Sequence, residues 1–316
     1  MKDWFIVDGH CDTLLDIADG KRCFDGSTAG GHLDLPRLQQ GGVRLQFFAA
    51  FIGSEYKPER ALKRALFLVN AFHQMVEHHP VLTHITHGSD IEELFSTDKI
   101  GALLAIEGGE ALAGSVELLE LYHRLGLRSL TLTWNQRNEL ADGVGEGNNA
   151  GGLTKFGKRV IQQMNRLGML VDVSHLSDAG FWDVLQVSTE PIIASHSNCR
   201  ALCNHRRNLT DDQIKALAQA DGVMGVTLAG DFIHEYTPSL NRLVDHIEHV
   251  VQLVGIEHVG LGSDFDGVDR LPPEIPDVSA LPRLTEVLQS RGFTPEHIQA
   301  ILGGNLLRIL RQVLPK

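Results

Sequence analysis

The sequence predicts an α/β fold, a (β/α)8 TIM barrel. Two patterns lead to this prediction. Short apolar runs rich in β-branched residues recur along the 316 residues, and segments with apolar residues at three- and four-residue intervals separate them. Strands that are buried on both faces and joined through helices form parallel sheets, and eight such units close a barrel. We expect one domain over residues 1–316, with additional C-terminal helices.

Eight apolar runs, each bounded by glycine or polar residues, are the candidate strands. They span residues 5–8, 43–51, 101–107, 128–134, 168–175, 191–196, 222–228 and 258–264. Between them, amphipathic spacing predicts helices, most clearly over 60–79, 153–168 and 209–222. Residues 272–314 then form a Pro-rich loop followed by closing helices. The order of strand and helix alternates throughout.

Composition narrows the classes of partner. With 43% hydrophobic and 22% charged residues, the chain has enough apolar material for a large core. Its 28 Lys and Arg stand against 40 Asp and Glu, and the net charge of −12 argues against nucleic acids and anionic membranes. We therefore expect a small-molecule partner.

The termini and cysteines bear on localisation. The segment MKDWFIVDGH is too short and too acidic for a secretion signal, and RILRQVLPK lacks the apolar tail of a lipid anchor. We therefore expect a cytoplasmic protein. Cys11, Cys23, Cys199 and Cys203 form no CxxC pair, so we expect reduced thiols.

Polar residues gather where the predicted strands end. They are His10, Asp12, Glu107, His175, His196 and Asp264. Each alone has a structural explanation, such as a turn, a helix-initiating carboxylate or a hydrogen-bonded core histidine. The carboxyl ends of barrel strands share one rim, and histidine nitrogen with carboxylate oxygen is a donor set that zinc accepts. Their recurrence therefore predicts a two-metal hydrolytic site and a barrel of the metal-dependent hydrolase type.

Five segments carry a resemblance to a known family. VDGHCDT, LLAIEGGEAL, LVDVSH, IIASHSNCRALCNHRRNL and VGLGSDFDG are similar, in the same order, to peptidase family M19, the membrane or renal dipeptidases. The resemblance covers essentially the whole chain. It implies a barrel with two Zn²⁺ ions, although other divalent ions could serve, and it suggests a homodimer.

The resemblance also implies residue roles. His10 and Asp12 would bind one metal, His175 and His196 the other, and Glu107 would bridge both. Asp264 matches the acid/base residue, while Asp266 is expected to be structural and Cys11 to have no chemical role. Arg207 matches the residue that grips the substrate carboxylate, for which a guanidinium fork is suited, although the adjacent Arg206 is an alternative.

One position departs from the mammalian family pattern. Trp134 stands where those members have a substrate-contacting His. An indole nitrogen can donate a hydrogen bond but cannot accept one or carry charge. Asn135, Gln136 or Asn138 could supply the missing contact, and we expect Trp134 and Asn135 to bind substrate.

The resemblance implies a dipeptidase that hydrolyses free dipeptides, including those with a C-terminal D-residue, by attack of a metal-bridging hydroxide. A first alternative is a metal-dependent N-acyl amino acid deacylase, or another amide or ester hydrolase, on the same barrel. A second is a non-catalytic metal- or ligand-binding barrel. The complete set of candidate ligands together with Asp264 argues against the second alternative.

Overall fold

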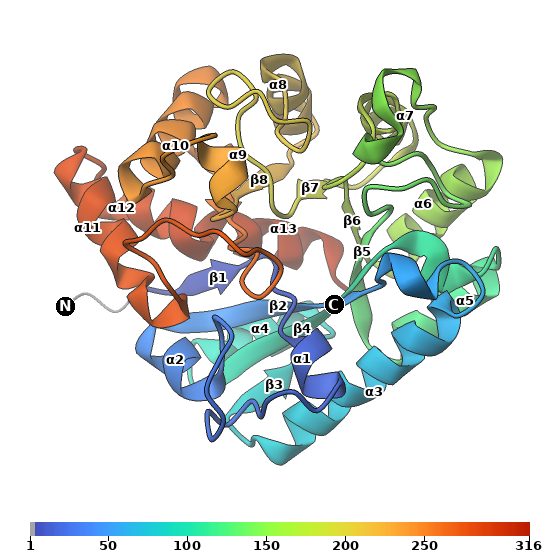
Figure 1. Ribbon diagram of the computed structural model, residues 1–316, viewed down its shortest axis with the longest axis horizontal. Coiled ribbons are helices and arrows are strands. Elements are labelled where there is room, and N and C mark those ends of the chain that lie inside the picture. Colours follow the sequence, from blue (N-terminus) through green and yellow to red (C-terminus); the bar gives the residue numbers. More distant parts are fainter. Residues whose placement is uncertain (1–3) are drawn as a thin grey trace.

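The computed structural model describes residues 4–316 and contains one sheet of nine parallel strands (Figure 1). Eight strands close into a ring in the order β1-β2-β4-β5-β6-β7-β8-β9, because β2 pairs with β4 as well as β1. This ring confirms the predicted (β/α)8 barrel. The strands are β1 (Ile6–Asp8), β2 (Val43–Phe51), β3 (Leu82–His84), β4 (Ile100–Glu107), β5 (Leu127–Thr131), β6 (Leu170–Asp172), β7 (Ile193–Ala194), β8 (Val223–Val226) and β9 (Val259–Leu261).

Helices surround the sheet on the outside (Figure 1). The helices predicted over 60–79, 153–168 and 209–222 are present as α3, α6 and α8, and closing helices follow the Pro-rich loop. The helices are α1 (Leu14–Ala18), α2 (Leu35–Gln40), α3 (Ala61–His78), α4 (Gly88–Leu94), α5 (Val116–Arg124), α6 (Lys155–Leu167), α7 (Asp178–Val187), α8 (Asp211–Gln219), α9 (Gly230–Ile233), α10 (Leu240–Val254), α11 (Pro282–Ser290), α12 (Pro295–Gln299) and α13 (Asn305–Val313).

Several strands are shorter than the sequence predicts. The run 168–175 is a strand only to Asp172, and the run 258–264 only to Leu261. His175 and Asp264 each have φ of 66°, a left-handed conformation that cannot continue a strand. These polar residues therefore lie in the loops immediately beyond the strands.

A ninth strand, β3, was missed in the sequence. It pairs with the first residues of β4, where Leu82 lies opposite Ile100, and stands outside the closed ring. Two of its three residues, Thr83 and His84, are polar and half-buried, so no apolar run marks it in the sequence. The eight strands of the ring all fall within predicted runs or one residue from them.

Helix α13 covers the end of the barrel at which the strands begin. Asn305 donates to the carbonyl of Val259, the first residue of β9, and Arg308 donates to the carbonyl of Asp221, just before β8. Leu306 and Leu310 share an apolar cluster with strand residues such as Leu45. Because this end is filled, the opposite rim is the open one.

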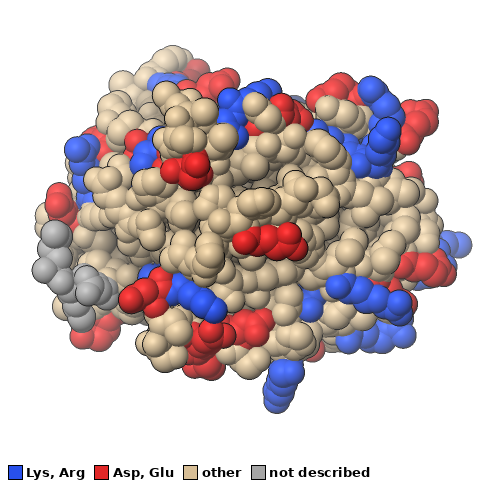
Figure 2. Space-filling view, turned by 90° about the horizontal axis from the view of Figure 1, so that it is seen from below, with Lys and Arg blue, Asp and Glu red and all other residues tan. Residues whose placement is uncertain are grey.

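All four cysteines are free, as expected, and Cys11 is fully buried. Over residues 4–316, none of the helices combines the length and apolar character needed to span a bilayer. Figure 2 shows acidic and basic side chains interspersed on the face seen from below Figure 1.

Candidate active site

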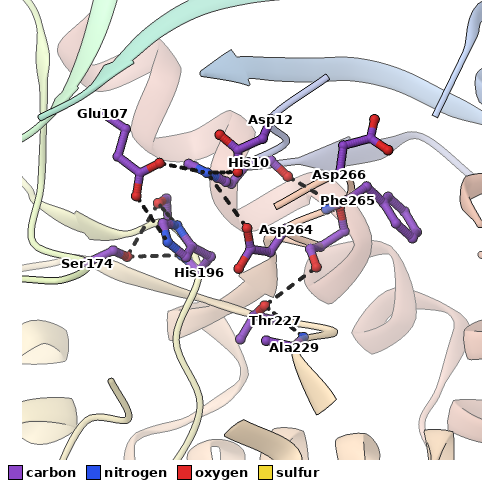
Figure 3. Close-up of polar contacts among 12 residues, drawn as sticks. His10, Asp12, Glu107, Ser174, His196, Thr227, Ala229, Asp264, Phe265 and Asp266 are labelled. Carbon is purple, nitrogen blue, oxygen red and sulfur yellow. Dashed lines mark hydrogen bonds and ion pairs between the residues drawn. The ribbon is translucent and has the colours of Figure 1, made fainter. Parts of the chain in front are cut away.

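Six residues singled out in the sequence meet at the open rim of the barrel. Figure 3 shows Glu107, Asp12 and Asp264 around the ring of His10. All six side chains belong to residues that are at least nine-tenths buried. They are His10 and Asp12 after β1, Glu107 at the end of β4, His175 after β6, His196 after β7 and Asp264 after β9.

The two oxygens of Glu107 face different partners. Oε2 lies 3.5 Å from Nε2 of His10, which is itself 3.5 Å from Oδ2 of Asp12. Oε1 lies 2.9 Å from Nε2 of His175 and 3.8 Å from Nε2 of His196. The cluster therefore has two halves that meet at one carboxylate.

Hydrogen bonds outside the cluster fix the tautomers of two histidines. Nδ1 of His175 lies 2.8 Å from Oδ1 of Asn135, and Nδ1 of His196 lies 2.7 Å from the hydroxyl of Ser195. That hydroxyl donates its proton to Asp172 at 2.6 Å, so it accepts from His196. Both Nε2 atoms consequently carry lone pairs, and they face each other at 2.9 Å.

The backbone around the cluster is held in an unusual conformation. The φ of 66° at both His175 and Asp264 lies in a region that residues other than glycine seldom occupy. The carbonyl of His175 accepts from Val144 at 2.9 Å, and the amide of Asp264 donates to the carbonyl of His10 at 3.2 Å. Strain of this kind is concentrated at functional sites.

Burial shifts the pKa of Asp264, His175 and His196, whereas at His10 the charges of Glu107 and Asp12 outweigh burial and raise the pKa. Burial raises the pKa of Asp264 to about 8, although the facing His10 ring opposes this shift. It lowers the pKa of His175 to about 4, with the charge of Arg207 acting in the same direction, and holds the pKa of His196 well below its usual range. Neutral imidazoles, which can bind a metal, therefore lie beside a carboxyl group that can hold a proton.

The cluster fits divalent cations. Nε2 of His10 and Oδ1 of Asp12 are buried without a hydrogen-bond partner, and the facing lone pairs of His175 and His196 repel each other unless a cation lies between them. A Cβ at position 267 would collide with the carboxylates of Asp12 and Asp264, so only glycine leaves this space open. The arrangement can hold a metal within each half.

A cavity of about 410 Å³ opens onto the cluster, within the usual range for small-molecule sites. Arg207 lines it, is 4% exposed, and donates from Nη2 to the carbonyl of His196 at 3.0 Å. Its Nε is buried without a hydrogen-bond partner. Arg206 is exposed and lines a different hollow, so Arg207 is the arginine that faces the cluster.

Trp134 and Asn135 line the same cavity. The Trp134 ring centroid lies 6.0 Å from that of His175, while the Asn135 carbonyl already accepts from His175. Gln136 is exposed and accepts from Ser54, and Asn138 donates to the carbonyl of Leu132. Of the three polar candidates, Asn135 alone lines the cavity.

Asp266 is bound by the surrounding chain, as expected of a structural residue. Its carboxylate accepts from the hydroxyl of Thr13 at 2.6 Å and from the guanidinium of Arg22, and the backbone amide of His32 also donates to it. The turn that carries Asp264 is thereby fixed to the chain after β1.

Sequence reasoning missed several residues of the site. Asp172 and Ser195 orient His196, and the motifs DVSH and SHS, which place them next to the histidines, were an available signal. His205 and Phe232 line the cavity with their rings stacked 4.3 Å apart, but they follow different strands and no sequence pattern connects them.

The fold and the cluster define the class: a (β/α)8 barrel that carries a metal-type set of donors at the carboxyl ends of its strands. The sequence pattern of the membrane dipeptidases, peptidase family M19, matches residues 1–314. The chain belongs to peptidase family M19. This confirms the resemblance found in the sequence.

The chain is similar to proteins named as dipeptidases along most of its length. It is 34% identical over 324 residues to Dipeptidase 3 of Mus musculus, a match that covers 99% of this chain and 65% of that protein. It is 36% identical over 299 residues to Dipeptidase aclJ of Aspergillus oryzae, covering 90% of this chain and 70% of that protein. The chain thus spans just under two thirds of the length of the mouse relative.

A solved structure supports the fold assignment. It is a metallopeptidase from Rhodobacter sphaeroides, liganded with a phosphinate mimic of the dipeptide L-Ala-D-Ala. It matches this chain with a TM-score of 0.94 and 28% sequence identity, covering 99% of this chain and 100% of that one.

Proposed function

We propose that the protein is a metal-dependent dipeptidase that hydrolyses free dipeptides, including those with a C-terminal D-residue. The observation that carries this proposal is the shared cavity: a buried arginine with an unpaired Nε and a buried His–carboxylate cluster line the same space. A small substrate with a terminal carboxylate could therefore contact both.

The metal would be two Zn²⁺ or other divalent ions. His10 and Asp12 would hold one ion, His175 and His196 the other, and Glu107 would share its two oxygens between them. When bound, the ions would supply an ionised water as nucleophile and polarise the scissile carbonyl.

The remaining roles belong to residues of the chain. Asp264, whose Oδ1 lies 3.9 Å from Nε2 of His10, can in its ionised form accept a proton from the nucleophile and then deliver it to the departing amine. Arg207 retains its charge, since burial lowers its pKa only to about 10, and can bind the substrate carboxylate. Asn135 positions His175, and Trp134 forms part of the cavity wall.

The relatives support the substrate class. Two of them are named as dipeptidases, and the Rhodobacter sphaeroides enzyme was solved with a mimic of a dipeptide that ends in D-Ala. Tolerance of a C-terminal D-residue is accordingly part of the proposal.

The test is hydrolysis of L,L and L,D dipeptides by zinc-loaded protein, with N-acetylated and C-amidated versions of each peptide. A metal-stripped sample and the same sample reloaded with zinc are the controls. We expect metal-dependent cleavage of free dipeptides only. Cleavage confined to N-acetylated substrates would instead support the deacylase alternative, and bound metal without any turnover would contradict the dipeptidase function.

A further inference from the structure

One side of the active-site cavity is apolar. It is formed by Leu15 on α1, Phe51 at the end of β2 and Trp134 after β5, which we call the apolar wall. Phe51 is the register partner of Glu107 in the sheet, so the wall begins beside the cluster. The ring centroids of Phe51 and Trp134 lie 5.3 Å apart, which makes their surface continuous.

The apolar wall lies across the barrel from Arg207. Its residues follow β1, β2 and β5, whereas Arg207 and Phe232 follow β7 and β8. In the closed order β1-β2-β4-β5-β6-β7-β8-β9, these two groups of strands occupy opposite arcs of the ring. The cluster lies between them, with ligand candidates on β1, β4, β6, β7 and β9.

The order of groups along a dipeptide matches the order of Arg207, the cluster and the apolar wall across the barrel. The carboxylate and the N-terminal side chain of a dipeptide lie on opposite sides of the scissile carbonyl. With the carboxylate on Arg207 and the carbonyl at the cluster, the N-terminal residue reaches the opposite arc. On the strength of the proposed function, we infer that the apolar wall binds the N-terminal side chain, and that the enzyme prefers dipeptides with a large apolar N-terminal residue.

Trp134 is held in place for this role. Nζ of Lys57 lies 5.4 Å from the centroid of its ring and 2.8 Å from Oε1 of Glu110. The Lys57 and Glu110 side chains are 10% and 3% exposed, so this ion pair is a buried support for the indole. A wall fixed before the substrate arrives loses less conformational entropy on binding.

The residues of the apolar wall also line a second hollow, next to the active-site cavity. This hollow of about 290 Å³ is lined by Leu15, Phe51 and Trp134 together with Tyr56 and Arg64. The three wall residues therefore border both hollows, and the second hollow is also lined by charged residues such as Asp19 and Lys21.

The experiment compares Leu-Gly, Phe-Gly, Asp-Gly and Gly-Gly as substrates of the zinc-loaded enzyme. We expect kcat/KM for Leu-Gly and Phe-Gly to exceed that for Gly-Gly and Asp-Gly by about tenfold or more, the discrimination that a few buried methylene groups provide. Trp134→Ala should lower kcat/KM for Leu-Gly about tenfold more than for Gly-Gly. Trp182→Ala, at a 40% exposed tryptophan on α7, is the matched control and should keep the wild-type preference.

A second variant and a binding measurement extend the test. Leu15→Ala, on a different element, should reduce the same preference even if Trp134→Ala fails to fold. Calorimetry with phosphinate mimics of Leu-D-Ala and Gly-D-Ala should show tighter binding of the leucine compound, and Trp134→Ala should narrow that difference.

The outcomes separate this inference from the proposed function. Cleavage of all four dipeptides at similar rates would overturn the inference and leave the dipeptidase function standing. If Trp134→Ala changed the ratio of kcat/KM between Leu-Gly and Leu-D-Ala, the C-terminal residue would be the one at the apolar wall. That result would also overturn the inference. Absence of any dipeptide hydrolysis would overturn both.

Discussion

The Nε2 atoms of His175 and His196 lie 2.9 Å apart, and the outer nitrogen of each ring is held by an oxygen of Asn135 or Ser195. The outer contacts direct both lone pairs toward the same space. The two rings are therefore positioned by the protein itself for a cation.

Ser195→Ala removes the acceptor that fixes the tautomer of His196. We expect zinc affinity to fall by about 10- to 100-fold, since contacts of this kind orient metal ligands. Competition with a chromophoric zinc chelator measures the change. Ser290→Ala, at an exposed serine on α11, should bind zinc as the wild type does, and unaltered affinity in Ser195→Ala would show that the hydroxyl does not position the ring.

Glu107→Ala removes the carboxylate that faces both halves of the cluster. The metal content per chain should fall for both ions, which mass spectrometry of the dialysed protein can count. Glu286→Ala, at an exposed glutamate on α11, is the control. Retention of two ions per chain would exclude a bridging role.

Asp264→Asn keeps the size of the side chain but cannot transfer a proton. Metal content should remain, while kcat should fall by about 10²- to 10⁴-fold, the usual contribution of general acid–base catalysis. Asp269→Asn, at an exposed position in the same loop, should retain turnover. Activity near that of the wild type would remove Asp264 from the mechanism.

Arg207→Gln removes the charge proposed to bind the substrate carboxylate. Charge-assisted hydrogen bonds contribute about 1.5–3 kcal/mol, so kcat/KM for free dipeptides should fall by roughly 10- to 100-fold. The variant should also lose its discrimination against C-amidated substrates. Arg206→Gln changes the neighbouring exposed arginine, and an equal loss in both variants would argue against a specific contact.

His84 lies on β3, far from the cluster, and makes the free energy of unfolding depend on pH. Burial lowers the pKa of His84 to about 4, although its hydrogen bond to the Gly126 carbonyl, 3.1 Å away, opposes the shift. The unfolded chain, with an ordinary histidine pKa near 6.5, binds more protons between about pH 4 and 6.5. The free energy of unfolding should therefore decrease by about 1–3 kcal/mol as the pH falls through this window.

Urea unfolding at pH 7.5 and 5.0 tests this dependence. His84→Gln, which has no titrating ring, should lose less stability between the two pH values than the wild type does. His297→Gln, at an exposed histidine on α12, should keep the wild-type dependence. An identical pH dependence in all three proteins would show that His84 is not responsible.

The fold was largely predictable because its signals are local. Apolar runs such as 43–51 and amphipathic segments such as 60–79 show their period within a few turns or pleats, and they correspond to β2 and α3. β3 could not be found this way because two of its three residues, Thr83 and His84, are polar and interrupt the apolar run. The ends of β6 and β9 were missed because the apolar runs continue past Asp172 and Leu261, whereas the backbone leaves the sheet there and reaches a positive φ at His175 and Asp264.

The sequence by itself determined the alternation of strands and helices, and with it the placement of His10, Glu107, His196 and Asp264 at one rim. This follows because parallel strands of a barrel all end on the same side. Only the tertiary structure decided which oxygen of Glu107 faces which histidine, that Arg207 and not Arg206 faces the cavity, and that Trp134 meets Phe51. These contacts join loops that follow strands far apart in the chain, so local residue patterns cannot predict them.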